Sequence, residues 1–416
     1  MAAAAAERPR VEPEPIVATT LRALVDQAAL RRALGHAARV APRRAVLPWL
    51  EDTVRLSQVW GSGLLRIDAT DFDTRLSLWV DAGRCHPGAA AVPLRFLRSA
   101  VTAMEAGSLL LSPAPKKSTA LSVEGGGVTL AVTQRELGPW PEFAPDFATG
   151  EPSDAAPVTF EAADFVRAAR AALSCVASDG DRPVLQCLSI KGREGSVEFV
   201  AADGFRLAIA TAPAAFPGAF ASLVPYRAVK LVCDLLGSKP AGQVTMRCPQ
   251  QGTLMPWNEP VASVAGRVTF ALDGAWVSAV QAPWTFPDYL KLIPEEHKTR
   301  VTVPAAAFRR AVKLAGTAAV DGSGIVRLEM TPRDGLTVSG LAAETGSVTV
   351  RLASAVEGEP GKIAVNMRYL ADALRLFEGD VSVDLEEPSK QCVFWSAQQP
   401  GLKVVVMPMF VQWGDS

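Results

Sequence analysis

One sequence pattern occurs three times in this chain, and the repeat restricts the folds that the chain can adopt. Amphipathic segments at 29–38, 164–173 and 307–316 each place an apolar anchor before basic residues and alanines. A second amphipathic segment follows each of them about 60 residues later, at 92–105, 224–237 and 365–379. A repeat of about 140 residues, itself made of two halves, predicts a tandem array of similar domains.

The length of 416 residues agrees with three domains of ordinary size. Two stretches rich in Pro, Gly and charged residues, 134–157 and 283–300, are predicted to connect them. The boundaries that follow are a flexible N-terminal tail at 1–19 and domains at 20–150, 156–297 and 298–416.

Strand patterns follow the first helical segment of each repeat. Apolar residues alternate with polar ones over 65–69 and 76–80, over 197–201 and 207–209, and over 326–330 and 336–338. Short turns containing Asp or Gly separate the two members of each pair. Period-two alternation across such turns predicts antiparallel hairpins with one buried face. Each half-repeat is therefore expected to be a helix packed on antiparallel strands, an α+β fold.

The predicted helices are basic, although the whole chain has a net charge of −1. Six windows hold 14 Lys or Arg and only six Asp or Glu: 27–39, 94–105, 161–172, 226–236, 305–315 and 367–378. Six basic helix faces against an acidic remainder indicate a polyanion contacted through its phosphates, without sequence readout. Because basic residues do not alternate with aromatic ones, duplex DNA is favoured over single strands.

Residue patterns for catalysis are missing from the sequence. The three histidines lie in different repeats, and the chain has no HExxH, phosphate-binding loop or GxSxG motif. Asp68, Asp71 and Asp73 form an acidic cluster that could hold metal ions. We interpret it, with its counterparts Asp203 and Glu344, as turn residues that close hairpins. We therefore expect no catalytic residue, no metal site and no cofactor.

Cysteine usage and hydropathy indicate a cytoplasmic protein without membrane contact. The six cysteines form no CxxC pair and lie mostly in apolar runs, which is typical of buried, reduced thiols. No apolar run approaches the length of about 18 residues that a membrane span needs. The N-terminal residues lack the order of charges and apolar residues found in a signal peptide.

Five short motifs resemble those of the bacterial DNA polymerase III beta subunit family, the sliding clamps. They are LPWL at 47–50, VPLRFL at 92–97, AADGFRLA at 201–208, FPDYLKLIP at 286–294 and VVVMPM at 404–409. The similarity runs from about residue 20 to residue 411. It implies three tandem clamp domains, each with two helix-plus-antiparallel-sheet halves. It also implies a head-to-tail homodimeric ring that encircles double-stranded DNA and catalyses no reaction.

The resemblance also implies a groove between the second and third domains that receives short peptides from DNA polymerase subunits and the clamp loader. Carried over position by position, the groove would be formed by Leu185, Ala202, Gly204, Phe205, Arg206, Leu207, Pro287, Lys291, Leu292, Gln391, Val405, Met407, Pro408 and Met409. Flexible Met and aliphatic side chains suit an adaptable apolar pocket.

The basic positions expected to include the DNA contacts belong to the predicted helices and to the segment after the first of them. They are Arg31, Arg32, Arg44, Arg98, Arg167, Arg170, Arg227, Lys230, Arg309, Arg310, Lys313, Arg368 and Arg375. For the ring, strands near 120–132 and 342–352 are expected to present complementary edges, because ring closure removes exposed strand edges.

The sequence departs from the family pattern at several places. Phe205 and Ala202 replace the family's His and Thr, and the chain continues as FVQWGDS after the MPM motif, where the family has Arg-Leu. From these changes we expect a narrower or partly capped groove. The segment 249–266 resembles an enlarged loop, and Asp179 stands at a position where a polar, DNA-facing residue is expected. Three alternatives stay open: a specialised paralogue, a clamp-like scaffold that does not encircle DNA, and an enzyme whose active site the motifs do not reveal.

Overall fold

The computed structural model describes residues 21–58, 63–115, 119–136, 140, 156–177, 180, 182–193, 195–248, 266–294, 296–320, 323–342, 344 and 346–413. The predicted N-terminal tail, Asp179 and nearly all of the 249–266 segment lie outside these ranges. The chain forms two compact units, residues 1–150 with 274–276, and residues 151–273 with 277–416. Each unit is described by itself.

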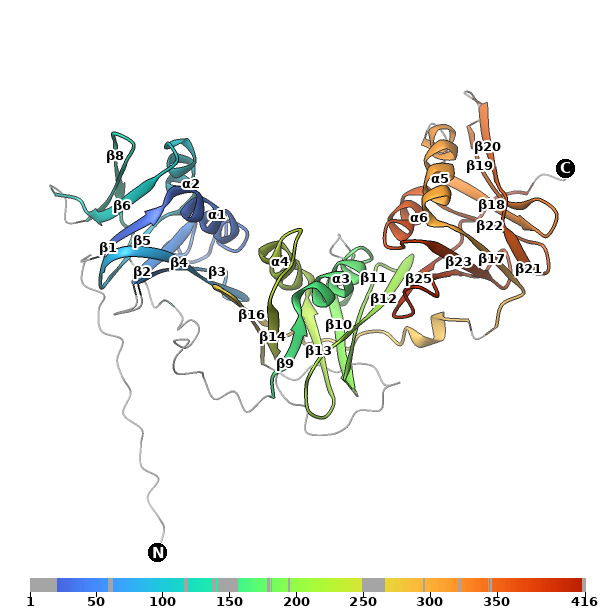
Figure 1. The fold of residues 1–416 in the computed structure, drawn as a ribbon, viewed down its shortest axis with the longest axis horizontal. Coiled ribbons are helices and arrows are strands. Elements are labelled where there is room, and N and C mark those ends of the chain that lie inside the picture. Colours follow the sequence, from blue (N-terminus) through green and yellow to red (C-terminus); the bar gives the residue numbers. More distant parts are fainter. Residues whose placement is uncertain are drawn as a thin grey trace, which may run out of the picture. The chain divides into compact units, whose positions relative to one another are not determined.

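The described residues of the first unit combine two helices with antiparallel strands (Figure 1). The helices are α1 (Gln27–Ala37) and α2 (Leu94–Ala103). The strands are β1 (Arg22–Asp26), β2 (Thr53–Gln58), β3 (Leu64–Thr70), β4 (Thr74–His86), β5 (Gly88–Pro93), β6 (Ser108–Pro113), β7 (Ala120–Gly125) and β8 (Val128–Thr133). Strands follow the order β8-β7-β6-β1-β4, and β3 continues from β4 to β2 and β5.

Among its described residues, the second unit contains four helices, two 3-10 turns and three antiparallel sheets. The helices are α3 (Ala162–Leu173), α4 (Tyr226–Leu236), α5 (Ala305–Val320) and α6 (Met367–Leu374), and the 3-10 turns are η1 (Pro183–Gln186) and η2 (Leu290–Leu292). One sheet has the order β16-β15-β14-β9. Its strands are β9 (Val158–Glu161), β14 (Gln243–Arg247), β15 (Arg267–Leu272) and β16 (Ala275–Val280). Only the last four residues of β16 belong to this unit.

A longer sheet of the second unit has the order β13-β10-β11-β12-β25-β24-β23-β17-β21. Its strands are β10 (Cys187–Arg193), β11 (Ser196–Ala202), β12 (Arg206–Pro213), β13 (Phe220–Pro225), β17 (Thr299–Pro304), β21 (Ala355–Gly358), β23 (Asp380–Leu385), β24 (Cys392–Trp395) and β25 (Leu402–Val406). The last sheet, β20-β19-β18-β22, has β18 (Ile325–Thr331), β19 (Gly335–Ala342), β20 (Gly346–Leu352) and β22 (Gly361–Asn366).

The six predicted helices are all present, and they pack in three pairs, α1 with α2, α3 with α4 and α5 with α6. The predicted anchors Leu30, Phe165 and Phe308 are fully buried. Each helix follows a strand directly, and side chains at Asp26 and Asn366 cap α1 and α6 by accepting hydrogen bonds from backbone N–H groups. The helix-plus-antiparallel-sheet prediction is confirmed.

The three predicted hairpins are also present, as β3–β4, β11–β12 and β18–β19. Two of them use the same turn chemistry. The Asp71 carboxylate accepts a hydrogen bond from the Thr74 N–H at 2.6 Å, and the Asp203 carboxylate accepts one from the Arg206 N–H at 2.9 Å. The turn interpretation is wrong for Asp68. That residue is fully buried inside β3, where it pairs with Arg66 at 2.8 Å.

One glycine allows α5 to approach the sheet beneath it closely. A Cβ at Gly340 on β19 would lie 2.0 Å from the carbonyl oxygen of Ala315 on α5. Any larger residue would therefore push α5 away from the sheet that it covers.

Five cysteines whose side chains are described are buried and unpaired: Cys175, Cys187, Cys233, Cys248 and Cys392. Burial raises the pKa of each of these thiols to about 12, so they stay protonated at neutral pH. In the part of the chain that the structure describes, no helix is long and apolar enough to span a membrane.

Candidate functional site

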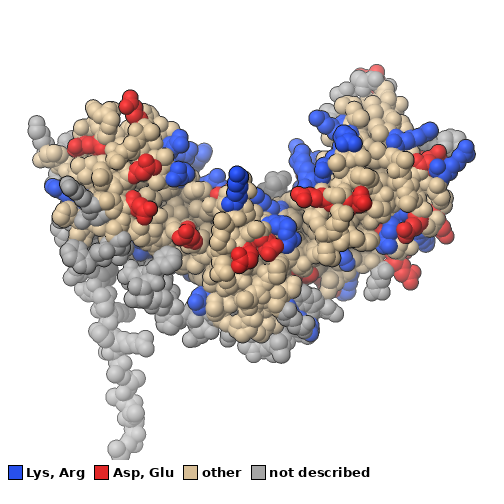
Figure 2. Space-filling model, in the orientation of Figure 1, with Lys and Arg blue, Asp and Glu red and all other residues tan. Residues whose placement is uncertain are grey.

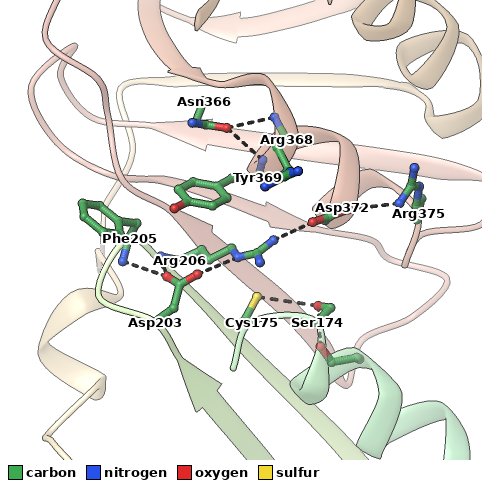
Figure 3. Close-up of polar contacts among 11 residues, drawn as sticks. Ser174, Cys175, Asp203, Phe205, Arg206, Asn366, Arg368, Tyr369, Asp372 and Arg375 are labelled. Atoms are coloured by element: carbon green, nitrogen blue, oxygen red, sulfur yellow. Dashed lines mark hydrogen bonds and ion pairs between the residues drawn. The ribbon is translucent and has the colours of Figure 1, made fainter. Parts of the chain in front are cut away.

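The turn between β11 and β12 is held rigidly by one carboxylate. Asp203 accepts hydrogen bonds from the backbone N–H groups of Phe205 and Arg206, both at 2.9 Å, and from Arg206 Nε at 2.9 Å (Figure 3). Gly204 has φ of +92°, a conformation that favours glycine. The turn therefore presents Phe205 and Arg206 in fixed directions.

Arg206 connects this turn to α6. Its Nη1 donates to Asp372 at 2.9 Å, and Asp372 also accepts from Arg375 at 3.0 Å (Figure 3). Burial by itself would lower the pKa of Arg206, but the hydrogen bonds to Asp372 and Asp203 outweigh it and raise the pKa. The guanidinium thus serves as an internal bridge between residues 166 positions apart.

An aromatic contact lies beside the bridge. The Phe205 ring stacks against Tyr369 with 6.1 Å between ring centroids, and the Arg206 guanidinium lies 4.7 Å from the centroid of the Tyr369 ring. Phe205 is nevertheless 56% exposed. Tyr369 and Asp372 are therefore part of this site, although the sequence did not indicate them. Their i, i+3 spacing on α6 places them on one face, but no local pattern points to a partner in a distant hairpin.

The end of β25 and the residues after it join the same region. The Met407 N–H donates to the Phe205 carbonyl at 2.8 Å, and the Met409 N–H donates to the Ala364 carbonyl at 2.7 Å. Met407, Pro408 and Met409 are all partly exposed. This short segment thus fastens the β12 hairpin to β22.

An apolar cluster underlies the segment. Leu207 on β12 and Val405 on β25 are buried in it, and Ala202 packs against it. Leu185 on η1 is 5% exposed, and its carbonyl accepts from the Ala177 N–H. The structure therefore brings Leu207, Val405 and Ala202 into one cluster, in which Leu185 is not included, although Val184 of the same 3-10 turn packs against it.

The 3-10 turn η2 forms a second side of this candidate site. Gln391 donates from Nε2 to the Leu292 carbonyl at 2.9 Å, and Lys291 pairs with Asp288 at 3.1 Å. Leu292 is 42% exposed, and Pro287 is exposed as well. The predicted linker 283–300 is thus packed on the sheet of the second unit.

The C-terminal extension lies against the β18–β22 sheet. Trp413 packs on Arg327 at 5.2 Å and Lys362 at 4.9 Å, and Arg327 donates to the Gln412 carbonyl. Phe410 is 95% exposed and so fills no pocket of its own chain. Two cations thus hold the indole of Trp413, and the partly capped groove stays a prediction.

The basic positions lie on the surface of the helices. Figure 2 shows Lys and Arg side chains gathered over the helices of each unit. All of the predicted DNA-contact residues are exposed except Arg309, which is half-buried, and all except Arg44 belong to a helix or its C-cap. In the first unit, α1 and α2 bring Arg32 and Arg98 to one depression of about 380 Å³, which Arg39 and His36 also line. Arg39, which lies two residues beyond the end of α1, was missed.

Each helix pair is fastened by one side chain that caps the partner helix. Gln27 on α1 donates to the carbonyls of Val101 and Met104 at 2.6 and 3.3 Å. Arg170 on α3 donates to Cys233 and Gly237 at 3.3 and 2.7 Å. Arg309 on α5 donates to Leu374 and Phe377 at 2.9 and 2.8 Å. These three capping residues satisfy carbonyls that a helix end leaves without partners.

Other predicted DNA contacts form weak pairs within their own helices. Arg167 pairs with Asp164, Lys230 with Asp234 and Arg375 with Asp372, each near 3 Å. Exposed pairs of this kind contribute little to stability and are readily exchanged for other anions.

Comparisons with known proteins agree with this architecture. Residues 290–410 match the family model for the DNA polymerase III beta subunit, C-terminal domain. The chain is 26% identical over 406 residues to the beta sliding clamp of Caulobacter vibrioides (strain NA1000 / CB15N), which covers 94% of this chain and 100% of the relative.

Solved structures show the same fold. The DNA polymerase III beta subunit of Thermotoga maritima superposes with a TM-score of 0.81 at 20% identity, covering 94% of this chain and 100% of that one. The C. crescentus beta sliding clamp, crystallised with polyethylene glycol at a proposed beta-motif tethering region, gives 0.79 at 24% identity, covering 94% and 99%. Residues 290–410 thus match the C-terminal domain of the DNA polymerase III beta subunit, and the chain resembles the bacterial beta sliding clamps in sequence and fold along nearly its whole length.

Proposed function

We propose that the chain is a DNA sliding clamp: a non-catalytic, cytoplasmic processivity factor that encircles duplex DNA as a homodimer and tethers polymerases through a peptide groove. The observation that carries the proposal is the threefold repetition of a helix pair with exposed basic residues over antiparallel sheets. Contacts with phosphates need no particular base sequence, so the ring could slide along the duplex.

The proposal includes three domains, at 20–150, 156–297 and 298–416. Each would hold one helix pair. The second and third would share a continuous sheet, since β12 pairs with β25 from Arg206–Val406 to Ala210–Leu402. This sharing accounts for the compactness of the second unit.

Two free strand edges support head-to-tail dimerisation. Among the described residues, β8 pairs only with β7, and β20 pairs only with β19. Antiparallel addition of β8 from one copy to β20 of another would satisfy the backbone groups of both edges. The same interface repeated by two-fold symmetry would close a ring.

The groove proposal rests on exposed apolar side chains around a buried floor. Phe205, Leu292 and the Met407–Met409 segment are accessible, whereas Leu207 and Val405 form the floor beneath them. A short apolar peptide from a polymerase subunit or a clamp loader fits such a surface. Arg206 would act there by fixing the wall of the groove, because Asp203 and Asp372 hold its guanidinium.

A threading experiment tests encirclement without any loader. A linear duplex biotinylated at both ends is incubated with the protein, its ends are then blocked with streptavidin, and the complex is washed at high salt. A ring is retained only on the blocked duplex, because it leaves an open duplex through the ends. Equal retention with and without streptavidin contradicts encirclement. Retention on neither duplex, together with peptide binding, favours the clamp-like scaffold.

Sedimentation tests the interface. Leu130→Glu places a charge on β8 and is expected to shift the dimer toward monomer. Leu314→Glu, at an exposed leucine of α5, is the matched control and is expected to leave the dimer intact. If both variants sediment as the wild type does, dimerisation through β8 is wrong.

A further inference from the structure

The segment between β16 and β17 is anchored on the long sheet by two aromatic residues. Phe286 and Tyr289 are 1% and 3% exposed, and they pack in the apolar cluster with Leu207 and Val405. Their rings meet edge to face, with centroids 6.1 Å apart. The two residues that anchor this segment thus belong to the same apolar cluster as the floor of the groove.

Tyr289 also makes a polar contact inside this cluster. Its hydroxyl donates to the carboxylate of Glu198 on β11, and the Nζ of Lys191 on β10 lies 5.2 Å from the centroid of its ring. All three side chains are buried. A hydroxyl in such surroundings needs a partner, since a lost hydrogen bond would leave both polar groups without compensation.

The ionisation of these groups reflects their burial. Desolvation raises the pKa of Glu198, although the hydrogen bond from Tyr289 and the charge of Lys191 oppose it. Desolvation likewise lowers the pKa of Lys191 against the charges of Glu198 and Asp288. The Tyr289 hydroxyl, the Glu198 carboxylate and the Lys191 ammonium group therefore stabilise one another beneath the segment between β16 and β17.

The backbone carries this anchoring to the exposed edge of the groove. The Leu292 N–H donates to the Tyr289 carbonyl at 3.0 Å, and the Leu292 carbonyl accepts from Gln391 at 2.9 Å. Leu292 is thus fixed from both sides while its own side chain stays 42% exposed. Loss of either tie would let η2 move relative to the floor.

We propose that Tyr289 is a positioning residue for partner binding: its hydrogen bond to Glu198 fixes η2 and so holds Leu292 at the edge of the groove. The proposal deepens the peptide-groove function and rests on it. A peptide that packs on Leu292 must otherwise order η2 when it binds, and this ordering lowers its affinity.

The central variant is Tyr289→Phe, which removes the hydroxyl and keeps the ring. The matched control is Tyr226→Phe, a tyrosine of α4 that lies outside the apolar cluster. The probe is a fluorescein-labelled apolar peptide of the kind that clamp-binding polymerases carry, and its Kd is measured by anisotropy. Tyr289→Phe is expected to weaken binding about three- to tenfold. Tyr226→Phe is expected to leave Kd unchanged.

Two further measurements separate positioning from general destabilisation. Amide hydrogen exchange at Leu292 and Ile293 is expected to accelerate in Tyr289→Phe, while amides of β11 and β12 keep wild-type protection. Glu198→Gln, which keeps an acceptor oxygen, is expected to bind more tightly than Glu198→Leu, which has none. Equal affinities for these two Glu198 variants, or unchanged exchange at Leu292, would overturn the proposal.

Two other variants distinguish failure of this inference from failure of the groove. If Leu292→Ala and Met407→Ala weaken binding and Tyr289→Phe does not, the groove is correct and positioning by Tyr289 is wrong. If neither Leu292→Ala nor Met407→Ala changes Kd, the peptide docks elsewhere. The groove and the role of Tyr289 then fail together.

Discussion

The helix pair α1–α2 and the helix pair α5–α6 are fastened in the same way by different chemistry. In the first, the buried amide of Gln27 donates to two carbonyls at the end of α2. In the second, the guanidinium of Arg309 does the same at the end of α6. The amide is neutral, so the task needs a donor and not a charge. A basic residue on these helices is therefore not necessarily a DNA contact.

The pair α3–α4 is also fastened by an arginine. Arg170 caps α4 as Arg309 caps α6, but its side chain is exposed and one of its two bonds is long, at 3.3 Å. A cation near a helix C-terminus also interacts favourably with the helix dipole. Arg170 and Arg309 thus combine a structural contribution with a positive charge, whereas exposed residues such as Arg310 contribute the charge alone.

The largest expected effect comes from neutralising basic residues that cap no helix. Replacing Arg31, Arg98, Arg310 and Lys313 with Gln is expected to reduce the slope of log K for DNA against log salt by as much as about 3.6 for each protomer of the ring, at about 0.9 for each lost phosphate contact. Thermal stability and dimerisation should not change. Titration of duplex DNA at several salt concentrations measures the slope, and an unchanged slope would place the DNA path on another surface.

Gln27→Ala is expected to have the opposite pattern: stability falls and the DNA salt slope is retained. Two carbonyls at the end of α2 lose their donor in a buried place, so the free energy of unfolding is expected to fall by about 2 kcal/mol. The DNA salt slope is expected to stay the same, because no charge is lost. Urea unfolding supplies the first value. Gln243→Ala, at an exposed glutamine, is the control and is expected to cost less than about 0.5 kcal/mol. A stability loss no larger than the control's would show that the cap is dispensable.

Arg309 and its neighbour Arg310 separate charge from capping within one helix. Arg309→Gln and Arg310→Gln each remove one positive charge from each protomer, so each is expected to lower the salt slope by about 0.9 per protomer if it contacts phosphate. Only Arg309→Gln is expected to reduce the free energy of unfolding, by about 1 kcal/mol. Parallel urea and salt titrations of both variants provide the comparison. Equal stabilities would mean that Arg309 contributes nothing as a cap.

The smallest expected effect is that of Arg170→Lys. Lysine keeps the charge but lacks the planar fork that reaches two carbonyls, so the free energy of unfolding is expected to fall by about 0.5 kcal/mol at this exposed site. The salt slope should be retained. Faster amide exchange in the last turn of α4 would locate the loss. A salt slope that fell in this variant would show that guanidinium geometry, and not charge alone, matters for DNA.

Much of the fold follows from local sequence patterns. Helical periodicity located all six helices, and the buried anchors Leu30, Phe165 and Phe308 were correct. Alternating strands and Asp-containing turns gave the three hairpins, because both signals act over a few residues. The motifs at 201–208 and 404–409 gave the resemblance to the beta subunit family. Repetition strengthened each local signal, since three copies of one pattern rarely arise by chance.

Other features depend on contacts between distant residues. Asp68 was expected in a turn but is buried in β3, because its partner Arg66 and the facing strand decide where its charge is stabilised. The contact of Arg206 with Asp372 and the stacking of Phe205 on Tyr369 join segments more than 160 residues apart. No spacing rule within a single helix or strand encodes such pairs.

The sequence by itself determined that this protein has a tandem α+β repeat with basic helices and an apolar C-terminal motif. Only the tertiary structure decided which arginines cap a neighbouring helix and which side chains surround the candidate groove. It likewise decided that β8 and β20 remain at sheet edges. The physical reason is that periodicity and turn preference are properties of neighbouring residues. Hydrogen bonds, ion pairs and free edges are instead settled by which distant segments the packed core brings together.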